Sequence, residues 1–119
     1  MEHDFVDRGI ASLFAGGMGN TGAVCGAVSG ALMAIGLRQG RADTEEGMFR
    51  NLELAREFRR RFEEEAGTIS CREMTETDLT TPEGVEGFMN SDTPMSVCFP
   101  AVGTAYRLAV DLLKEVSPP

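Results

Sequence analysis

The sequence predicts an all-α protein, a small bundle of four to five helices formed by a single domain over residues 1–119. Apolar residues recur at intervals of three or four in several long segments, which is the spacing of one face of a helix. No segment shows a sustained alternation with a period of two, as a half-buried strand would. With 42% hydrophobic and 25% charged residues, the 119-residue chain has the composition of one globular domain with a single core.

The first helix is expected from His3 to Ala15 and is followed by a glycine loop. Its apolar positions follow helical spacing at Phe5, Val6, Ile10, Leu13 and Phe14. The loop over residues 16–22 reads Gly-Gly-Met-Gly-Asn-Thr-Gly. Glycine costs about 1 kcal/mol relative to alanine inside a helix, so this loop ends the first helix.

A second, buried helix is expected from about Thr21 to Gln39, with small residues on one stripe. Gly22, Gly26 and Gly30 recur every four positions, with alanines beside them. Because glycine has no Cβ, such a stripe lets another backbone approach closely. We therefore expect a neighbouring segment to pack against it.

The third helix is amphipathic. Asp43 followed by Glu46 predicts a capping box at its start, and Gly67 predicts its end. Charged residues separate apolar positions that step by three or four: Met48, Phe49, Leu52, Ala55, Phe58, Phe62 and Ala66.

The last third of the sequence predicts a loop and a final helix. Thr75 to Asn90 is expected to be a loop with a short helical turn around residues 85–89. Pro100 suits the first turn of the final helix, because a proline inside the helix would cost about 3 kcal/mol. That helix carries an apolar face, and two prolines end the chain: Val102, Ala105, Tyr106, Ala109, Leu112, Leu113, Val116, then Pro118 and Pro119.

The charge of the chain argues against a nucleic-acid partner. Eleven Lys and Arg against 19 Asp and Glu give a formal net charge of −8. Binding to a phosphate backbone depends on clustered basic residues. The one basic run, residues 59–61, faces the acidic run at residues 63–65 and is locally neutralised.

No membrane span is expected, and the cytoplasm is the expected location. Residues 9–37 carry no charge, but the glycine loop divides them and leaves only Gly22 to Leu37. Those residues would form about 24 Å of helix, too short and too rich in glycine for a bilayer core. The first residues lack a basic region before an apolar run, so no secretory leader is expected.

One glycine motif resembles a dinucleotide-binding fingerprint but lacks its context. Residues 17–22 match G-x-G-x-x-G, and Asp43 lies about 20 residues further on. A Rossmann fold needs a buried strand before the loop and further βαβ units after it, and neither is predicted here. A turn between two helices is the better interpretation, with an anion at the following helix start as the alternative.

Cys25, Cys71 and Cys98 lie in three different segments, with spacings of 46 and 27 residues. These spacings exclude a local C-x-x-C motif, and an odd number of cysteines gives no disulfide framework. The residues alone leave three interpretations open: buried packing residues, a redox pair, or metal ligands. Cys25 is expected within the first turn of its helix and Cys98 near another helix start, where the helix dipole lowers a thiol pKa. His3 is interpreted as an exposed bystander.

Several of these residues resemble a known family. The run Gly16-Gly17-Met18-Gly19, then Gly22, then residues 25–33 (Cys-Gly-Ala-Val-Ser-Gly-Ala-Leu-Met) is similar to the core of the redox-active proteins named for their C-GCAxxG-C-C pattern. Ser70-Cys71-Arg72-Glu73, Asp78, and Cys98 before Pro100 resemble the later cysteine sites of that family. The resemblance implies a small helical protein whose cysteines converge on a redox or metal centre, and an association with a transport system.

The chain departs from the family pattern at one cysteine. The pattern has a fourth cysteine in a helix before the glycine loop, and no cysteine precedes Cys25 here. An all-thiolate zinc or iron–sulfur site uses four sulfurs, so three would need another ligand. A missing leading helix would also expose apolar surface that self-association can bury.

Three functions follow as hypotheses. The first is thiol–disulfide exchange, with Cys25 as nucleophile and Cys71 or Cys98 as its partner. The second is an electron carrier that binds an iron–sulfur cluster or zinc through the same three cysteines. The third is a non-catalytic helical domain that binds a second copy of itself or another helical partner.

Overall fold

The structure is a computed structural model and describes residues 8–116, in which every regular element is helical. This confirms the all-α prediction. Two short helices, α1 and α4, raise the number of α-helices in the described part to six. In chain order the elements are η1 (Arg8–Phe14, a 3-10 helix), α1 (Ala15–Met18), α2 (Gly26–Gln39), α3 (Glu45–Ala66), α4 (Cys71–Thr75), α5 (Pro82–Met89), η2 (Pro94–Cys98, a π-helix) and α6 (Phe99–Glu115).

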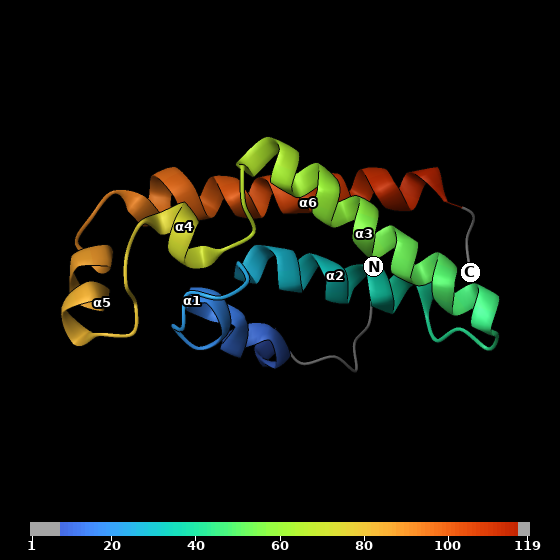
Figure 1. Ribbon diagram of the computed structural model, residues 1–119, viewed down its shortest axis with the longest axis horizontal. Helices are drawn as coiled ribbons and strands as arrows, with labels where there is room; N and C mark the ends of the chain where they lie inside the picture. The colour runs from blue at the N-terminus through green and yellow to red at the C-terminus, as the bar shows by residue number, and fades with distance from the viewer. Residues whose placement is uncertain (1–7, 117–119) are drawn as a thin grey trace.

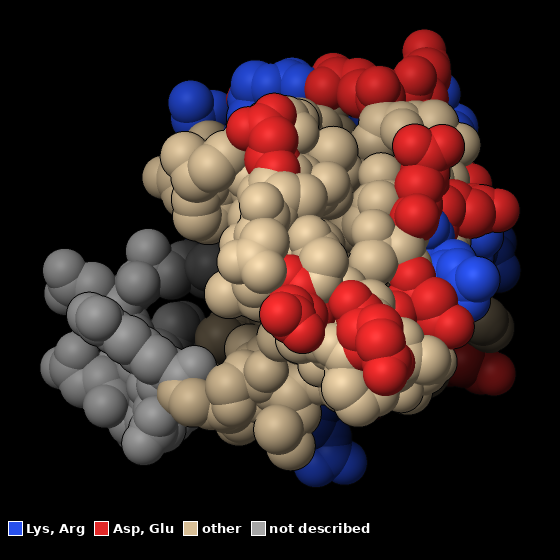
Figure 2. All heavy atoms as spheres, turned by 90° about the vertical axis from the view of Figure 1, so that its left-hand side faces the viewer, with Lys and Arg blue, Asp and Glu red and all other residues tan. Residues whose placement is uncertain are grey.

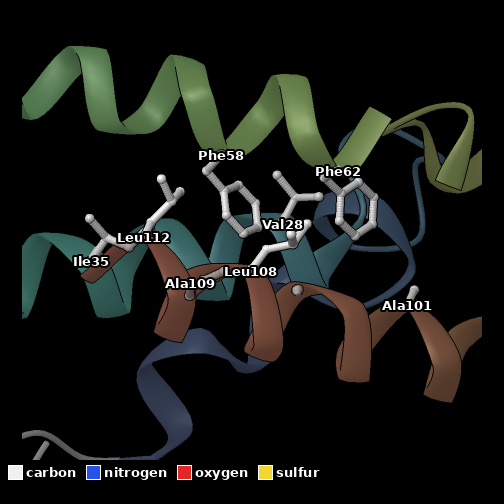
Figure 3. Close-up of a cluster of buried hydrophobic side chains, with 10 residues drawn as sticks. Val28, Ile35, Phe58, Phe62, Ala101, Leu108, Ala109 and Leu112 are labelled. Atoms are coloured by element: carbon white, nitrogen blue, oxygen red, sulfur yellow. The ribbon is translucent and has the colours of Figure 1, made fainter. Parts of the chain in front are cut away.

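The three long helices α2, α3 and α6 lie side by side and enclose the core (Figure 1). Phe58 and Phe62 on α3 are fully buried, and their rings stack with centroids 6.1 Å apart. They pack against Val28 of α2 and Leu108 and Leu112 of α6 (Figure 3). The second half of the apolar stripe predicted for the third helix therefore faces the core, through Phe58 and Phe62. Its first half does not, because Met48, Phe49 and Leu52 are between 50% and 61% exposed.

The α3 boundaries confirm one predicted cap and correct the other. Gly67 ends the helix with φ +89°, in the left-handed region that glycine favours. At the start, Thr44 is the N-cap, and its hydroxyl accepts a hydrogen bond from the Gly47 N–H at 3.0 Å. The predicted capping box of Asp43 and Glu46 is wrong by one residue, because Thr44 has the extended backbone that a capping side chain needs.

The second helix begins later than predicted, at Gly26 rather than Thr21. Gly22 has φ +76°, and Val24 forms an antiparallel bridge with Ser70, so neither belongs to the helix. The expected close packing exists at Gly26, where an added Cβ would lie 3.1 Å from the Phe14 carbonyl oxygen. It is absent at Gly30, where a Cβ would meet nothing within 4 Å. The glycine stripe is therefore packed at its start and open further along.

The first predicted helix is tighter and shorter than expected in its described part. Residues 8–14 form η1, and α1 then contains Gly16 and Gly17 with positive φ. These two conformations end the helical run, as the glycine loop predicts. His3, Phe5 and Val6 lie outside the described residues, as do the two final prolines.

The segment predicted as a loop with a short helical turn around residues 85–89 contains a helix at that place. This helix, α5, is longer than predicted, with Thr81 as its N-cap and Pro82 in its first turn. Pro100 lies in the first turn of α6, as predicted. However, α6 continues directly from the π-helical η2, and residue 98 has helical backbone angles. Cys98 is therefore not at a free helix start, because helical residues precede it.

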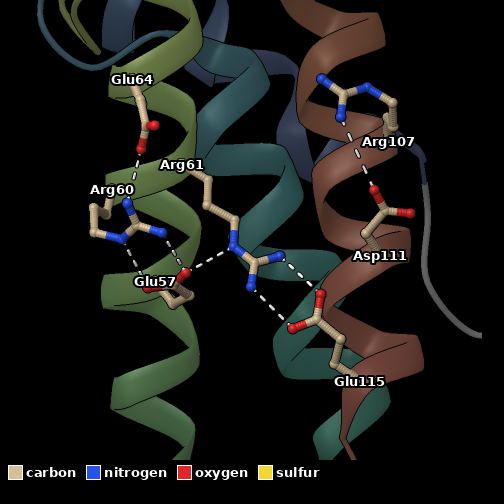
Figure 4. Close-up of polar contacts among 7 residues, drawn as sticks. All are labelled: Glu57, Arg60, Arg61, Glu64, Arg107, Asp111 and Glu115. Atoms are coloured by element: carbon tan, nitrogen blue, oxygen red, sulfur yellow. Dashed lines mark hydrogen bonds and ion pairs between the residues drawn. The ribbon is translucent and has the colours of Figure 1, made fainter.

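Ion pairs join the outer faces of α3 and α6 (Figure 4). Both terminal nitrogens of Arg61 donate to the Glu115 carboxylate at 2.9 Å, and Arg107 pairs with Glu65. Arg60 and Arg61 also donate to Glu57, and these hydrogen bonds lower the pKa of Glu57 to about 2. The predicted neutralisation of the basic run is confirmed, although Arg61 pairs with Glu57 and Glu115 rather than with the acidic run.

One helical stretch, Pro94–Glu115, is long and apolar enough to cross a membrane by length and composition. Its mean hydropathy is 1.2 over an 18-residue window, of which 28% is buried. A core helix meets the same criterion, and α6 contributes five buried side chains to the core. The uncharged stretch from Gly22 to Leu37 contains most of α2, whose 14 residues are too few to span a bilayer.

Candidate functional site

The three cysteines line one cavity of about 510 Å³. Cys25 is the N-cap residue of α2, Cys71 is the first residue of α4, and Cys98 is the last residue of η2. All three thiols are free. Three segments that are far apart in the sequence therefore bring their thiols to a common space, which the spacing alone could not establish.

A short backbone pairing brings Cys25 and Cys71 together. The Cys25 N–H donates to the Ile69 carbonyl and the Cys71 N–H donates to the Ala23 carbonyl, each at 2.7 Å, on either side of the Val24–Ser70 bridge. Because side chains alternate along extended segments, this register places the two cysteines on the same face, as diagonal neighbours.

The glycine loop makes this pairing possible. Gly17 has φ +73°, and a Cβ there would lie 2.6 Å from the Ala23 nitrogen and 2.7 Å from the Cys71 Cβ. Hydrogen bonds within the loop hold its backbone in place, because the Ala23 N–H donates to the Gly17 carbonyl and the Gly22 N–H donates to the Gly16 carbonyl. These N–H groups are therefore not available to a phosphate. The loop is a turn that positions Cys71, and no strand precedes it among the described residues.

Burial and mutual repulsion raise the pKa of two of the thiols. Desolvation is the larger cause at Cys71, followed by the nearby Cys25 and Cys98, while a hydrogen bond from Thr75 opposes the rise. Desolvation and then Cys25 raise the pKa of Cys98. The expectation that a helix start lowers the pKa of Cys98 is therefore wrong, because that residue lies inside a continuous helical run.

The part of the cavity wall formed by residues 8–116 is almost entirely apolar and carries no charged residue. Apart from the cysteines, only Ser12 and Asn20 contribute polar side chains. The remainder of the wall is aliphatic, aromatic or glycine: Ala11, Phe14, Ala15, Gly16, Gly26, Ala27, Leu79, Val85, Phe88, Met89 and Val102.

The wall contributed by α5 is the part of the site that the sequence reasoning missed. Val85, Phe88 and Met89 line the cavity from the residues predicted as a short helical turn within a loop, which the sequence analysis did not connect with the cysteines. Their spacing of three and four residues, after a Thr-Pro helix start, is the signal that identifies an amphipathic helix here.

The residues that the structure describes do not fit a metal ion or cluster. Among residues 8–116, no group of three or more His, Cys, Asp or Glu is arranged to hold a metal ion. The cavity wall contains no carboxylate or imidazole that could complete three thiolates.

A family model described as "Putative redox-active protein (C_GCAxxG_C_C)" matches residues 6–112. The chain belongs to the C_GCAxxG_C_C family. The matched residues include the glycine loop and all three cysteines. The segments that form the cavity therefore lie within the part of the chain that matches this family of redox-active proteins. No curated protein and no solved structure matches the chain.

Proposed function

We propose that this protein carries out thiol–disulfide exchange, with Cys25 and Cys71 cycling between a dithiol and a disulfide. The observation that carries the proposal is the backbone pairing that places these two cysteines on one face of a shared cavity. The redox description of the family supports the class of chemistry.

In the proposed reaction the Cys25 thiolate attacks one sulfur of a substrate disulfide and releases the other half as a thiolate, which takes a proton. The Cys71 thiol then loses its proton and attacks the Cys25 sulfur. This second attack releases the remaining half of the substrate and leaves a Cys25–Cys71 disulfide. Two electrons pass from the two protein thiols to the substrate, which becomes two thiols.

The difference in solvent exposure between Cys25 and Cys71 indicates which of the two thiols attacks the substrate first. Cys71 is only 8% exposed, whereas Cys25 is half-buried and so easier for a substrate to reach. The charge of Cys25 is one cause of the raised pKa of Cys71. That charge disappears once Cys25 enters a mixed disulfide, which eases deprotonation of Cys71 when it must attack. Cys98 is then a third thiol of the cavity and the alternative partner of Cys25.

The test is made on reduced protein purified without oxygen. Wild type and C98S are each mixed with a small disulfide, and the remaining thiols are counted. Both should lose two thiols per chain, and peptide mapping should find an intramolecular Cys25–Cys71 bond. C25S should lose no pair of thiols. Full exchange by C25S, or a stoichiometric bound metal on the three thiols, would contradict the proposal.

A second function, self-association, is favoured by an exposed apolar face that begins at Met95 of η2 and continues along α6. Met95, Phe99, Val102 and Tyr106 are between 54% and 73% exposed and follow one helix face at spacings of four, three and four. We call these four residues the α6 stripe. It borders a groove of about 370 Å³ beside the open part of the glycine stripe. We propose that a second copy of this chain packs there.

A further inference from the structure

We infer that the thiol cavity selects uncharged, apolar disulfides or thiols and rejects charged ones of either sign. This inference rests on the proposed thiol–disulfide exchange and adds the class of substrate. It follows from the volume of the cavity and from the composition of its wall, in which none of the described lining residues is charged.

A charged substrate would find no oppositely charged side chain on the part of the cavity wall that residues 8–116 form. None of the sixteen lining residues carries a charge, and Ser12 and Asn20 are the only polar side chains besides the thiols. Moving a charge out of water without a compensating partner is strongly unfavourable. The cavity thus opposes both carboxylates and ammonium groups close to the reacting sulfurs.

An apolar substrate would find a matching surface. Phe14 and Phe88 contribute aromatic rings, and Leu79, Val85 and Val102 contribute aliphatic surface. A volume of about 510 Å³ lies within the range of about 300–1,000 Å³ that is usual for small-molecule sites. Burial of apolar substrate surface is worth about 25 cal/mol for each Å².

The surface around α5 opposes anions as well. Figure 2 views the molecule from the end that carries α5, which forms one wall of the cavity, and shows a mainly uncharged face with several acidic side chains. Basic side chains appear at the edges of this view. With a net charge of −8, long-range attraction alone would favour cations. The overall field would exclude only anions, whereas the cavity wall is expected to exclude both anions and cations. Slow reaction of both charged reagents would therefore be an effect of the cavity and not of the net charge.

The experiment compares three small symmetrical disulfides with the reduced protein: diethyl disulfide, which is neutral, dithiodiglycolate, a dianion, and cystamine, a dication. Each rate is divided by the rate with the unfolded protein, so that the intrinsic reactivity of the reagent cancels. We expect diethyl disulfide to exceed both charged reagents by about tenfold, equivalent to about 1.4 kcal/mol. The rates are repeated at high salt, which screens long-range charge.

A matched pair of variants tests whether the wall is responsible. F88K places a cation on the cavity wall, and L52K adds the same charge at an exposed position of α3 outside the lining. F88K should raise the relative rate of dithiodiglycolate severalfold, and L52K should leave the three ratios unchanged.

The outcomes separate this inference from the proposed function. Equal normalised rates for the three reagents, or identical ratios in F88K and L52K, would overturn the inference and leave the exchange activity intact. A cystamine rate that is highest at low salt and falls at high salt would also overturn it, in favour of the overall field. Failure of every reagent to oxidise Cys25 and Cys71 would instead overturn the proposed function.

Discussion

At the scale of single residues, Cys71 is the thiol whose chemistry depends most on its neighbours. It is the most buried of the three, and the hydroxyl of Thr75 lies within its own helix turn, where it donates to the Cys71 carbonyl at 2.8 Å. A thiol must lose its proton to react, so a raised pKa delays reaction until higher pH. The protein can thereby hold Cys71 inert until Cys25 has reacted.

This dependence predicts the pH profile of Cys71 alkylation. Because the pKa of Cys71 is raised, its reaction with iodoacetamide should accelerate at higher pH in the folded protein than in the unfolded protein. C25S removes one cause of the rise and should move the profile toward lower pH. The rates are measured by mass spectrometry of the peptide that contains residue 71.

C98S provides the comparison for this experiment, because Cys98 ranks after Cys25 among the causes of the rise at Cys71. Its profile should move in the same direction but by less. A Cys71 profile that is the same in C25S and wild type would show that the two thiols do not interact.

At the scale of elements, the glycine loop and α4 form the framework of the site. Gly17 and Gly19 both have φ +73°, so alanine at either position would have to adopt the left-handed backbone region. Only at Gly17 would the added methyl group collide with another part of the chain, the Ala23 backbone and the Cys71 Cβ. The pair therefore separates close packing from backbone conformation.

We expect G19A to destabilise the protein by about 1–2 kcal/mol, the usual cost of a left-handed alanine. G17A should cost more than G19A and should slow formation of the Cys25–Cys71 disulfide, because it pushes α4 away from residue 23. Stability is measured by urea unfolding and disulfide formation by thiol counting. Equal effects of the two variants on both readouts would contradict a role for Gly17 in positioning Cys71.

The ion pairs that Glu57 forms with Arg60 and Arg61 within α3 predict that stability depends on acid. The pKa of Glu57 is lowered from 4.5 to about 2, so its stabilising contribution is fully present above pH 4.5 and is lost as the pH falls toward 2. E57Q should be less stable than wild type at neutral pH, and the difference should shrink over that acid range. Urea midpoints at a series of pH values measure it.

E46Q is the matched control, because Glu46 lies on the same helix and pairs with Arg50 only at 3.8 Å on an exposed surface. At neutral pH the free energy of unfolding of E46Q should differ less from that of wild type than the value for E57Q does. If E57Q were less stable than wild type by the same amount at pH 2 as at pH 7, the loss of the ion pairs with Arg60 and Arg61 would not be the cause of that difference.

The sequence predicts the long helices better than it predicts where they begin and how the segments between them pair. Local spacing identifies α2, α3 and α6, because their apolar faces bury against one another. The start of α2 is missed because residue 24 pairs with residue 70, an interaction between distant segments that local propensity does not encode. The same pairing brings Cys25 and Cys71 together, so the site depends on the feature that is hardest to predict. The family pattern identifies the cysteines from the sequence, whereas only the structure shows that α5 forms a wall of their cavity.

At the scale of the whole molecule, the chain exposes more surface than its mass requires. Its extents are 47 × 32 × 22 Å and its radius of gyration is 15.4 Å, against about 13.5 Å for a compact chain of this length. The accessible surface is 7979 Å², whereas a monomer of 12.8 kDa is expected to have about 6,300 Å². A standard interface buries about 800 Å² on each partner, so the excess is sufficient for a dimer.

The α6 stripe predicts where that dimer forms. Beside it, small residues such as Gly30, Ala105 and Ala109 line the groove and allow another helix to approach closely. Two copies related by a twofold axis would bury the same stripe on each other. Since each chain carries a charge of −8, added salt should strengthen the dimer by screening the repulsion between copies.

Sedimentation of wild type, Y106E and L52E tests this prediction. Tyr106 is 73% exposed on the stripe and Leu52 is 50% exposed on α3, and both substitutions add one negative charge. Burying an unpaired carboxylate in the interface should weaken the Y106E dimer by at least about tenfold, equivalent to about 1.4 kcal/mol. L52E should dimerise as wild type does, because its charge stays in water. A wild-type chain that remains monomeric at every concentration, or equal weakening by the two variants, would mean that the stripe is not the interface between copies.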